Sequence, residues 1–171
     1  MKPHITFVCT GGTFDKDYPV GRAYEFVIGD PAVSRVLSHV NPNFTMTVVS
    51  VLRKDSSDIN DQDRQRIRKA CLQTPGTEIV IIHGTDTMIK TARVLASLAT
   101  QMRKTIVLTG STKPQSFKDT DAEFNLGMAV TAVQILPSGV YIAMNGRVYD
   151  WDECQKNFKT GQFVGKNLFK L

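Results

Sequence analysis

The sequence predicts an α/β domain with a three-layer, doubly wound, mostly parallel sheet that is covered by helices on both faces. Short apolar runs rich in Val and Ile alternate along the chain with segments whose apolar residues recur at helical spacing. One run, residues 79–83, is continuous rather than alternating, which is typical of a parallel strand buried on both faces. Right-handed crossovers between such strands would bring the loops that follow them to one edge of the sheet.

The first half of the chain is expected to hold two strands and two helices. In order, these are strand 5–9, a helix from Pro31 to about residue 40 with Asp30 as its N-cap, strand 44–51, and a charged helix that follows the polar loop 53–61 and ends near residue 73. Between the first strand and the first helix, residues 14–30 show little periodicity. A loop of that length in a small domain is usually functional.

The second half is expected to add three strands and two helices. They are strand 79–83, a helix with an apolar face from Met88 to Ala99, strand 105–109, a helix that is capped by Thr120 or Asp121 and runs to about residue 135, and strand 140–144. Strand 79–83 is interpreted as the central strand. Thr85 or Asp86 is expected to cap the helix that follows it, because Thr and Asp are preferred N-cap residues. No helix or strand is predicted for residues 145–171.

Composition indicates one soluble globular domain without a membrane segment. The chain has 171 residues, of which 42% are hydrophobic and 22% are charged, as is ordinary for such a domain. No apolar run reaches the roughly 18 residues that cross a bilayer, and the N-terminus lacks the layout of a signal peptide. The three cysteines have no paired spacing, so no disulfide framework is expected and a cytoplasmic location fits.

The charge pattern argues against nucleic-acid and metal sites. The net charge is +5, from 21 basic and 16 acidic residues, and much of the excess lies near the C-terminus without interleaved aromatic residues. This favours a solvated surface over a nucleic-acid interface. The three histidines lack metal-ligand spacing. We therefore expect no metal, no cofactor, no nucleic acid and no membrane partner.

Polar side chains follow every predicted strand, at the edge where α/β proteins bind ligands. In chain order they are Thr13, then Ser56 and Ser57, then Thr85 and Asp86, then Ser111 and Thr112, and finally Asn145, Asp150 and Lys156. Hydroxyls with a carboxylate and a lysine favour nucleophilic attack by an alcohol, which needs a base such as a lysine of lowered pKa. Glycines beside the nucleophile would free backbone N–H groups to stabilise an oxyanion.

The Gly-rich stretch 10–13 could instead bind phosphate. It lacks the Gly-Lys-Ser/Thr ending of a P-loop and the third glycine of a dinucleotide fingerprint. A doubly wound nucleotide or flavin binder is therefore the alternative interpretation of the fold.

Two motifs resemble the signatures of the bacterial-type L-asparaginases. Thr10-Gly-Gly-Thr13 follows the first predicted strand, and His83-Gly-Thr-Asp-Thr87 follows the third. The likeness continues through 56–61, 107–114, 121–126 and 140–156, so it covers most of the chain. It implies a flavodoxin/Rossmann-like fold, with residues 1–171 forming a single domain like the N-terminal domain of that family and with no C-terminal domain.

The resemblance implies an amidohydrolase that converts L-asparagine to L-aspartate and ammonia through an acyl-threonine intermediate, with L-glutamine as an alternative substrate. Thr13 falls on the nucleophile of the family. Thr85, Asp86 and Lys156 fall on a second triad beside the substrate. Tyr24 is chosen as the tyrosine that assists the nucleophile, and Tyr18 is its rival.

The resemblance also implies a set of substrate-binding residues: Gly12, Ser56, Ser57, Gly84, Asp86 and Ser111. Ser56 falls on the position that binds the α-carboxylate, and Asp86 on one that pairs with the α-ammonium. Ser57 departs from the glutamine of the family and is shorter.

The family also has a C-terminal domain, which supplies acidic and amide groups to a neighbour's site, and nothing in this sequence replaces those groups. The alternative function is therefore a weak or inactive amino-acid-binding or regulatory module. Because family members assemble through this domain as well, a homodimer or homotetramer is expected.

Overall fold

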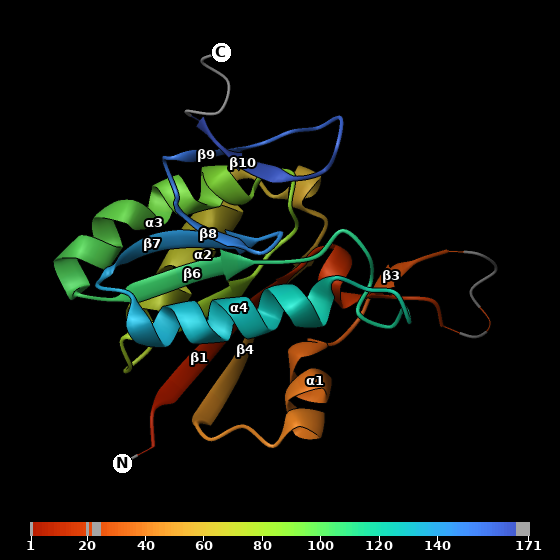
Figure 1. Cartoon of the computed structure of the whole chain (residues 1–171), viewed down its shortest axis with the longest axis horizontal. Coiled ribbons are helices and arrows are strands. Elements are labelled where there is room, and N and C mark those ends of the chain that lie inside the picture. The colour runs from red at the N-terminus through yellow and green to blue at the C-terminus, as the bar shows by residue number, and fades with distance from the viewer. Residues whose placement is uncertain (1, 20, 22–24, 167–171) are drawn as a thin grey trace.

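The computed structural model describes residues 2–19, 21 and 25–166. Its main elements are β1 (His4–Gly11), α1 (Val33–Val40), β4 (Thr45–Lys54), α2 (Asp61–Gln73), β5 (Glu78–Ile82), α3 (Met88–Met102), β6 (Thr105–Thr109), α4 (Ala122–Ile135), β7 (Gly139–Met144) and β8 (Arg147–Asp150). Figure 1 shows these elements as a sheet between two layers of helices. The predicted three-layer α/β class is confirmed.

The six-stranded sheet has the order β4-β1-β5-β6-β7-β8. Its first five strands are parallel, and β8 returns antiparallel to β7. Numbered along the chain, the parallel strands have the order 2-1-3-4-5 of flavodoxin-like doubly wound sheets. The strand β5 pairs with β1 on one side and β6 on the other, so the interpretation of residues 79–83 as an inner strand is confirmed.

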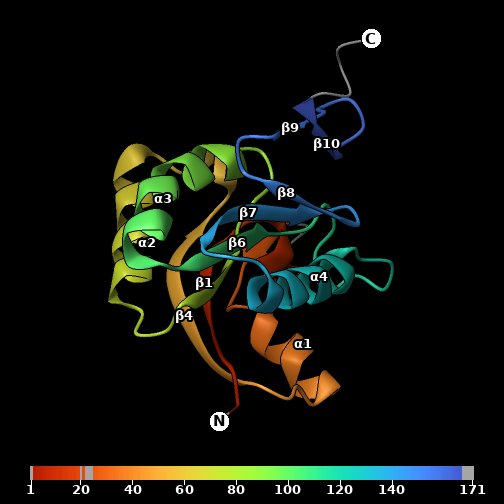
Figure 2. The same ribbon diagram turned by 60° about the vertical axis from the view of Figure 1, so that its left-hand side comes forward.

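The apolar side chains of β5 pack into two hydrophobic clusters, one on each face of the sheet. Ile79 and Ile81 pack in one cluster with residues of α2 and α3, while Val80 and Ile82 pack in the other with residues of α1 and α4. Figure 2 shows these two helix pairs on opposite sides of the sheet. Successive strand residues point to opposite faces, so a strand covered on both sides needs apolar residues at every position.

Two predicted helix caps are wrong. The helix α1 begins at Val33, and its N-cap is Ala32 rather than Asp30. The Asp15 carboxylate, which comes from the preceding loop, accepts a 2.9 Å hydrogen bond from the Ala32 N–H, while Asp30 pairs with Arg53 on the surface. The helix α3 begins at Met88 with Thr87 as its N-cap and without a side-chain cap bond.

The segments without predicted structure contain short elements. The 3₁₀ turn η1 (Thr13–Asp15) overlaps the start of the stretch 14–30, which also contains the two-stranded pair β2 (Lys16–Asp17) and β3 (Val27–Ile28). Beyond β8, the strands β9 (Cys154–Lys156) and β10 (Phe163–Gly165) form an antiparallel hairpin. Each is too short to show periodicity, so tertiary pairing decides its conformation.

The described part of the chain contains no helix that is long and apolar enough to span a membrane. The cysteines at positions 9, 71 and 154 are free and buried.

Candidate functional site

A polar cavity of about 280 Å³ lies where β1 and β5 end. It is lined by Thr13, Lys16, Asp55, Ser56, Gly84, Thr85, Asp86, Ser111, Thr112 and Lys156. These residues follow β1, β4, β5 and β6 or belong to β9. The position is the switch point of the sheet, where the connections after neighbouring strands diverge and ligands bind.

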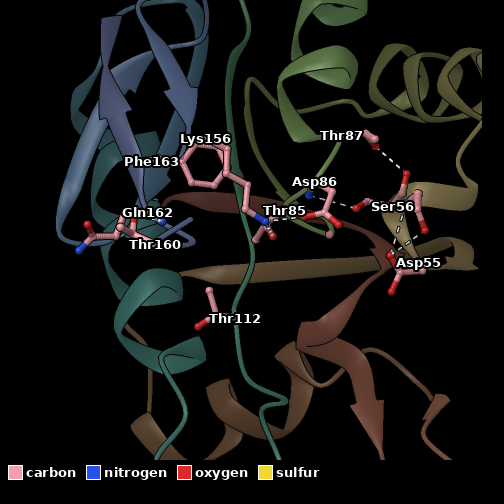
Figure 3. A network of polar contacts seen from close by, with 12 residues as sticks. Asp55, Ser56, Thr85, Asp86, Thr87, Thr112, Lys156, Thr160, Gln162 and Phe163 are labelled. Atoms are coloured by element: carbon pink, nitrogen blue, oxygen red, sulfur yellow. Dashed lines mark hydrogen bonds and ion pairs between the residues drawn. The ribbon is translucent and has the colours of Figure 1, made fainter. Parts of the chain in front are cut away.

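Lys156 joins the two polar side chains that follow β5. Its Nζ donates to Thr85 Oγ1 at 2.7 Å and pairs with Asp86 Oδ1 at 2.5 Å, as Figure 3 shows. The Lys156 side chain is only 11% exposed, whereas that of Asp86 is 50% exposed. Because an ammonium group only donates, Thr85 Oγ1 is the acceptor and can direct its own hydrogen to a bound ligand.

The hairpin that carries Lys156 is held against the sheet through Asn145. The Asn145 carboxamide oxygen accepts a 2.9 Å hydrogen bond from the Phe163 N–H, and its backbone N–H donates to the Asn125 carboxamide at 3.1 Å. Phe163 is the ladder partner of Lys156. Asn145 therefore helps to fix the position of the hairpin that carries Lys156. Asp150 lies exposed in β8.

Ser56 ties the loop after β4 to the loop after β5. Its buried Oγ accepts from the Asp86 N–H at 3.2 Å, and its carbonyl accepts from Thr87 Oγ1 at 2.7 Å. The Ser56 hydroxyl hydrogen remains for a ligand. A Cβ on Gly84 would lie 2.7 Å from the Ser56 Cβ, so only glycine allows this approach.

Gly12 places Thr13 against the same loop. It has φ +77, and a Cβ there would lie 2.5 Å from the Gly84 nitrogen. Gly12 does not line the cavity but lets the loop after β1 touch the loop after β5. Thr13 follows in the turn η1, half-buried, and lines the cavity. Within the described ranges, no residue hydrogen-bonds to its hydroxyl.

Two buried titratable groups support these loops. Asp15 is in the same turn as Thr13, and burial raises the pKa of its carboxyl to about 6. His83 directly precedes Gly84 in the chain, and burial lowers the pKa of its imidazole to about 4. Its Nδ1 lies 2.7 Å from the Gly84 carbonyl and its Nε2 lies 2.8 Å from Thr91 Oγ1. Since a carbonyl only accepts, the network assigns the hydrogen to Nδ1.

The remaining predicted residues lie in different places. Ser111 is buried and lines the cavity, and its Oγ donates to the Lys113 carbonyl at 2.6 Å. Ser57 is exposed and outside the cavity lining, where its N–H and Oγ each lie 3.3 Å from Asp55 Oδ1. Tyr24 lies outside the described residues. Its rival Tyr18 is 44% exposed and packs edge-on against Phe26.

Three residues line the cavity but were given no catalytic or binding role from the sequence: Lys16, Asp55 and Thr112. Of these, only Thr112 was noted as a polar group that follows a predicted strand. Lys16 Nζ pairs with Asp55 Oδ2 at 2.8 Å. The hydrogen bond from Lys16 holds the pKa of the Asp55 carboxyl below its usual value. Their only sequence signal is proximity, because Lys16 is three positions after Thr13 and Asp55 directly precedes Ser56.

A larger cavity, of about 700 Å³, lies between α4 and β8. Its lining is mostly apolar and includes the exposed side chains of Phe124, Ile135 and Val148. It holds none of the groups described above. The hydroxyl, carboxylate and lysine groups of the predicted site therefore line the smaller cavity and not the larger one. Among the described residues, no cluster of three or more His, Cys, Asp or Glu side chains could hold a metal ion.

Fold and site together define a doubly wound α/β domain with a hydroxyl-rich, lysine-containing site at its switch point. Residues 4–163 match the family model described as Asparaginase, N-terminal, and the chain belongs to this family. The suggested resemblance is thereby confirmed.

Curated relatives and solved structures agree with this assignment. L-asparaginase 2 of Escherichia coli K12 is 30% identical over 97% of this chain and 50% of the relative. A glutamyl-tRNA(Gln) amidotransferase component of Thermoplasma acidophilum is 27% identical over 85% and 36%. L-asparaginase I of Vibrio cholerae, at 25% identity, superposes with a TM-score of 0.80 over 96% of this chain and 52% of that one. The chain spans about half the length of the asparaginases it matches, or less.

Proposed function

We propose that this domain is an amidohydrolase that hydrolyses the side-chain amide of L-asparagine, with Thr13 as the nucleophile. The observation that carries the proposal is the cavity that Thr13 shares with Lys156, Thr85, Asp86 and Ser56. Family membership and the relatives named L-asparaginase support it. The relatives named as amidotransferase components support amide chemistry as well.

In the proposed reaction, Thr13 Oγ1 attacks the side-chain amide carbon and the C–N bond then breaks, which leaves an acyl-threonine and releases ammonia. The hydroxyl proton of Thr13 ends on the leaving nitrogen. Thr85 is suited to pass a proton, since its oxygen accepts from Lys156 and its own hydrogen is available to a ligand in the cavity that Thr85 lines. Water then hydrolyses the acyl-threonine and restores the hydroxyl.

The substrate would be held by its two charged ends. Ser56 has a hydroxyl hydrogen available for the α-carboxylate, and the half-exposed Asp86 has a second carboxylate oxygen for the α-ammonium. Ser111 closes another side of the cavity. A role for Ser57 in binding would require it to turn away from Asp55, and Tyr24 is kept as the proposed partner of Thr13.

Release of ammonia tests the proposal directly. Wild type, Thr13→Ala and Thr85→Val are compared on L-asparagine and L-glutamine, with Thr100→Ala on the exposed end of α3 as a matched control. We expect a loss of about 10³-fold or more in Thr13→Ala and no change in the control. Full activity in Thr13→Ala would transfer the nucleophilic role to Thr85. Binding of L-asparagine without turnover by wild type would support the alternative, a non-catalytic amino-acid-binding module.

We further propose that the chain assembles as a homodimer or homotetramer and functions in the cytoplasm. Sedimentation at micromolar concentration measures the assembly. A monomer that turns over L-asparagine at the full rate would contradict a role for assembly in the reaction.

A further inference from the structure

Two lysine–aspartate pairs line the cavity. Lys156 and Asp86 belong to the predicted site, whereas Lys16 and Asp55 do not. Lys16 lies in β2, directly after the turn that holds Thr13. Asp55 is the N-cap of the 3₁₀ turn η2 (Ser56–Asp58), which carries Ser56. The second pair thus flanks the proposed nucleophile and the proposed carboxylate-binding serine.

Within the second pair, Lys16 still has hydrogen-bond donors that could contact a ligand, whereas both oxygens of Asp55 already accept hydrogen bonds. Asp55 Oδ2 accepts from Lys16 at 2.8 Å, and Asp55 Oδ1 accepts from the N–H and Oγ of Ser57 at 3.3 Å. Both carboxylate oxygens are therefore engaged. An ammonium group has three donors, and Asp55 is the one partner of the Lys16 ammonium among the described residues. Two donors of Lys16 remain for a ligand in the cavity.

A purely structural role for the pair is a poor explanation, because other contacts already join the same segments. The Gly12 N–H donates to the Lys54 carbonyl at 2.9 Å, and Gly11 pairs with Lys54 in the sheet. Lys16 is also placed by its backbone pairing with Ile28. An additional exposed ion pair would add little stability, yet this one is partly buried in the cavity wall, with side chains 27% and 33% exposed.

We propose that Lys16 binds the α-carboxylate of the substrate and that Asp55 is a positioning residue that holds Lys16 toward the cavity. The inference rests on the proposed function and adds Lys16 and Asp55 to the residues that would hold the α-carboxylate. Lys16 offers a positive charge to an anion, while the open oxygen of Asp86 offers a negative charge to a cation. A free α-amino acid with a side-chain amide satisfies both, whereas a peptide-linked asparagine or a simple aliphatic amide does not.

Steady-state kinetics on L-asparagine test this role with Lys16→Met, Lys16→Arg and a control, Lys113→Met. Lys113 forms an exposed pair with Asp119 outside the cavity lining. Loss of a charge-assisted hydrogen bond should raise KM about 10- to 100-fold in Lys16→Met, with kcat changed less than about threefold. Lys16→Arg should restore most of the affinity, and the control should match wild type. An unchanged KM in Lys16→Met would overturn the assignment.

A second substrate separates carboxylate recognition from general damage to the site. In L-aspartic acid diamide, a neutral amide replaces the α-carboxylate. Wild type should discriminate strongly against it, and Lys16→Met should discriminate about tenfold less or not at all. An equal loss on both substrates in Lys16→Met would instead indicate a merely structural role for Lys16 and would overturn the proposal.

Calorimetric titration with L-aspartate makes the test independent of turnover. If wild type hydrolyses no amide, the proposed function fails, but Lys16→Met should still bind L-aspartate about tenfold more weakly than wild type. If wild type binds neither L-aspartate nor L-asparagine, the role of Lys16 is overturned as well. Should Lys16→Met fail to fold, Asp55→Asn provides the second variant, with an expected rise in KM of about three- to tenfold.

Discussion

Lys156 and Thr85 are 71 positions apart in the sequence, and a 2.7 Å hydrogen bond joins the ammonium of one to the hydroxyl of the other. The same ammonium pairs with Asp86. A tail lysine thus becomes the centre of a network at the end of β5. Its position depends on the hairpin of β9 and β10, which Asn145 fastens to the sheet.

Replacement of Lys156 by Met should reduce kcat on L-asparagine by about 10²- to 10⁴-fold, because Thr85 loses its donor and Asp86 loses its counter-charge. Lys159→Met, which alters an exposed lysine three positions further on, is the matched control and should be unaffected. Ammonia release measures both variants, and circular dichroism confirms that each is folded. An active Lys156→Met would remove Lys156 from the mechanism.

Replacement of Gly12 by Ala should destabilise the fold by about 2 kcal/mol or more and abolish activity. The added Cβ meets the Gly84 backbone at 2.5 Å, at a φ of +77. Gly161→Ala is a matched control, since Gly161 has φ +76 with no atom within 4 Å of an added Cβ. Gly161→Ala should lower the free energy of unfolding only by the cost of holding an alanine at positive φ, about 1 kcal/mol. If urea denaturation shows equal losses of stability in Gly12→Ala and Gly161→Ala, the contact between the two loops does not contribute to the stability of the fold.

Replacement of Asp15 by Asn should make the protein more stable at pH 7 than wild type. The pKa of Asp15 is about 6 in the folded chain against an ordinary 3.8, so the folded state binds the proton more tightly and Asp15 lowers stability as pH rises from about 4 to 6. The gain in Asp15→Asn should therefore grow over that range, to the order of 2 kcal/mol, and level off above it. Denaturation at several pH values measures this gain. A difference that does not vary with pH would contradict the prediction.

His83 should act in the opposite direction over nearly the same range. Its pKa is about 4 when folded against an ordinary 6.5, so the unfolded state binds the proton more tightly and wild-type stability falls as pH decreases from about 6.5 to 4. His83→Phe should lack this acid sensitivity. It should also be less stable at pH 7 by about 2 kcal/mol, because the Gly84 carbonyl and the Thr91 hydroxyl lose their partner. Retained acid sensitivity in His83→Phe would assign it to another group.

Errors in the expected helix ends have a common cause. Asp30 is well placed by local rules to cap α1, but the Asp15 carboxylate reaches the Ala32 N–H from the preceding loop and Asp30 pairs with Arg53 instead. Thr85 and Asp86 are good cap residues by type, yet Lys156 engages both. Cap preference is a local energy of about 1 kcal/mol, so a hydrogen bond from a residue distant in the sequence, such as that of Asp15 to Ala32, is enough to replace the expected cap.

The amino-acid sequence by itself determined the class of the sheet, the inner position of β5 and the set of loops that bear polar groups. A strand buried on both faces must be apolar throughout, and parallel strands must end at one edge, so these features are legible from pattern alone. Only the tertiary structure decided that Lys16 and Asp55 enter the cavity and that Ser57 stays out of its lining. Neither outcome has a periodic signal, because each depends on where two loops distant in sequence meet and which way a single turn directs its side chains.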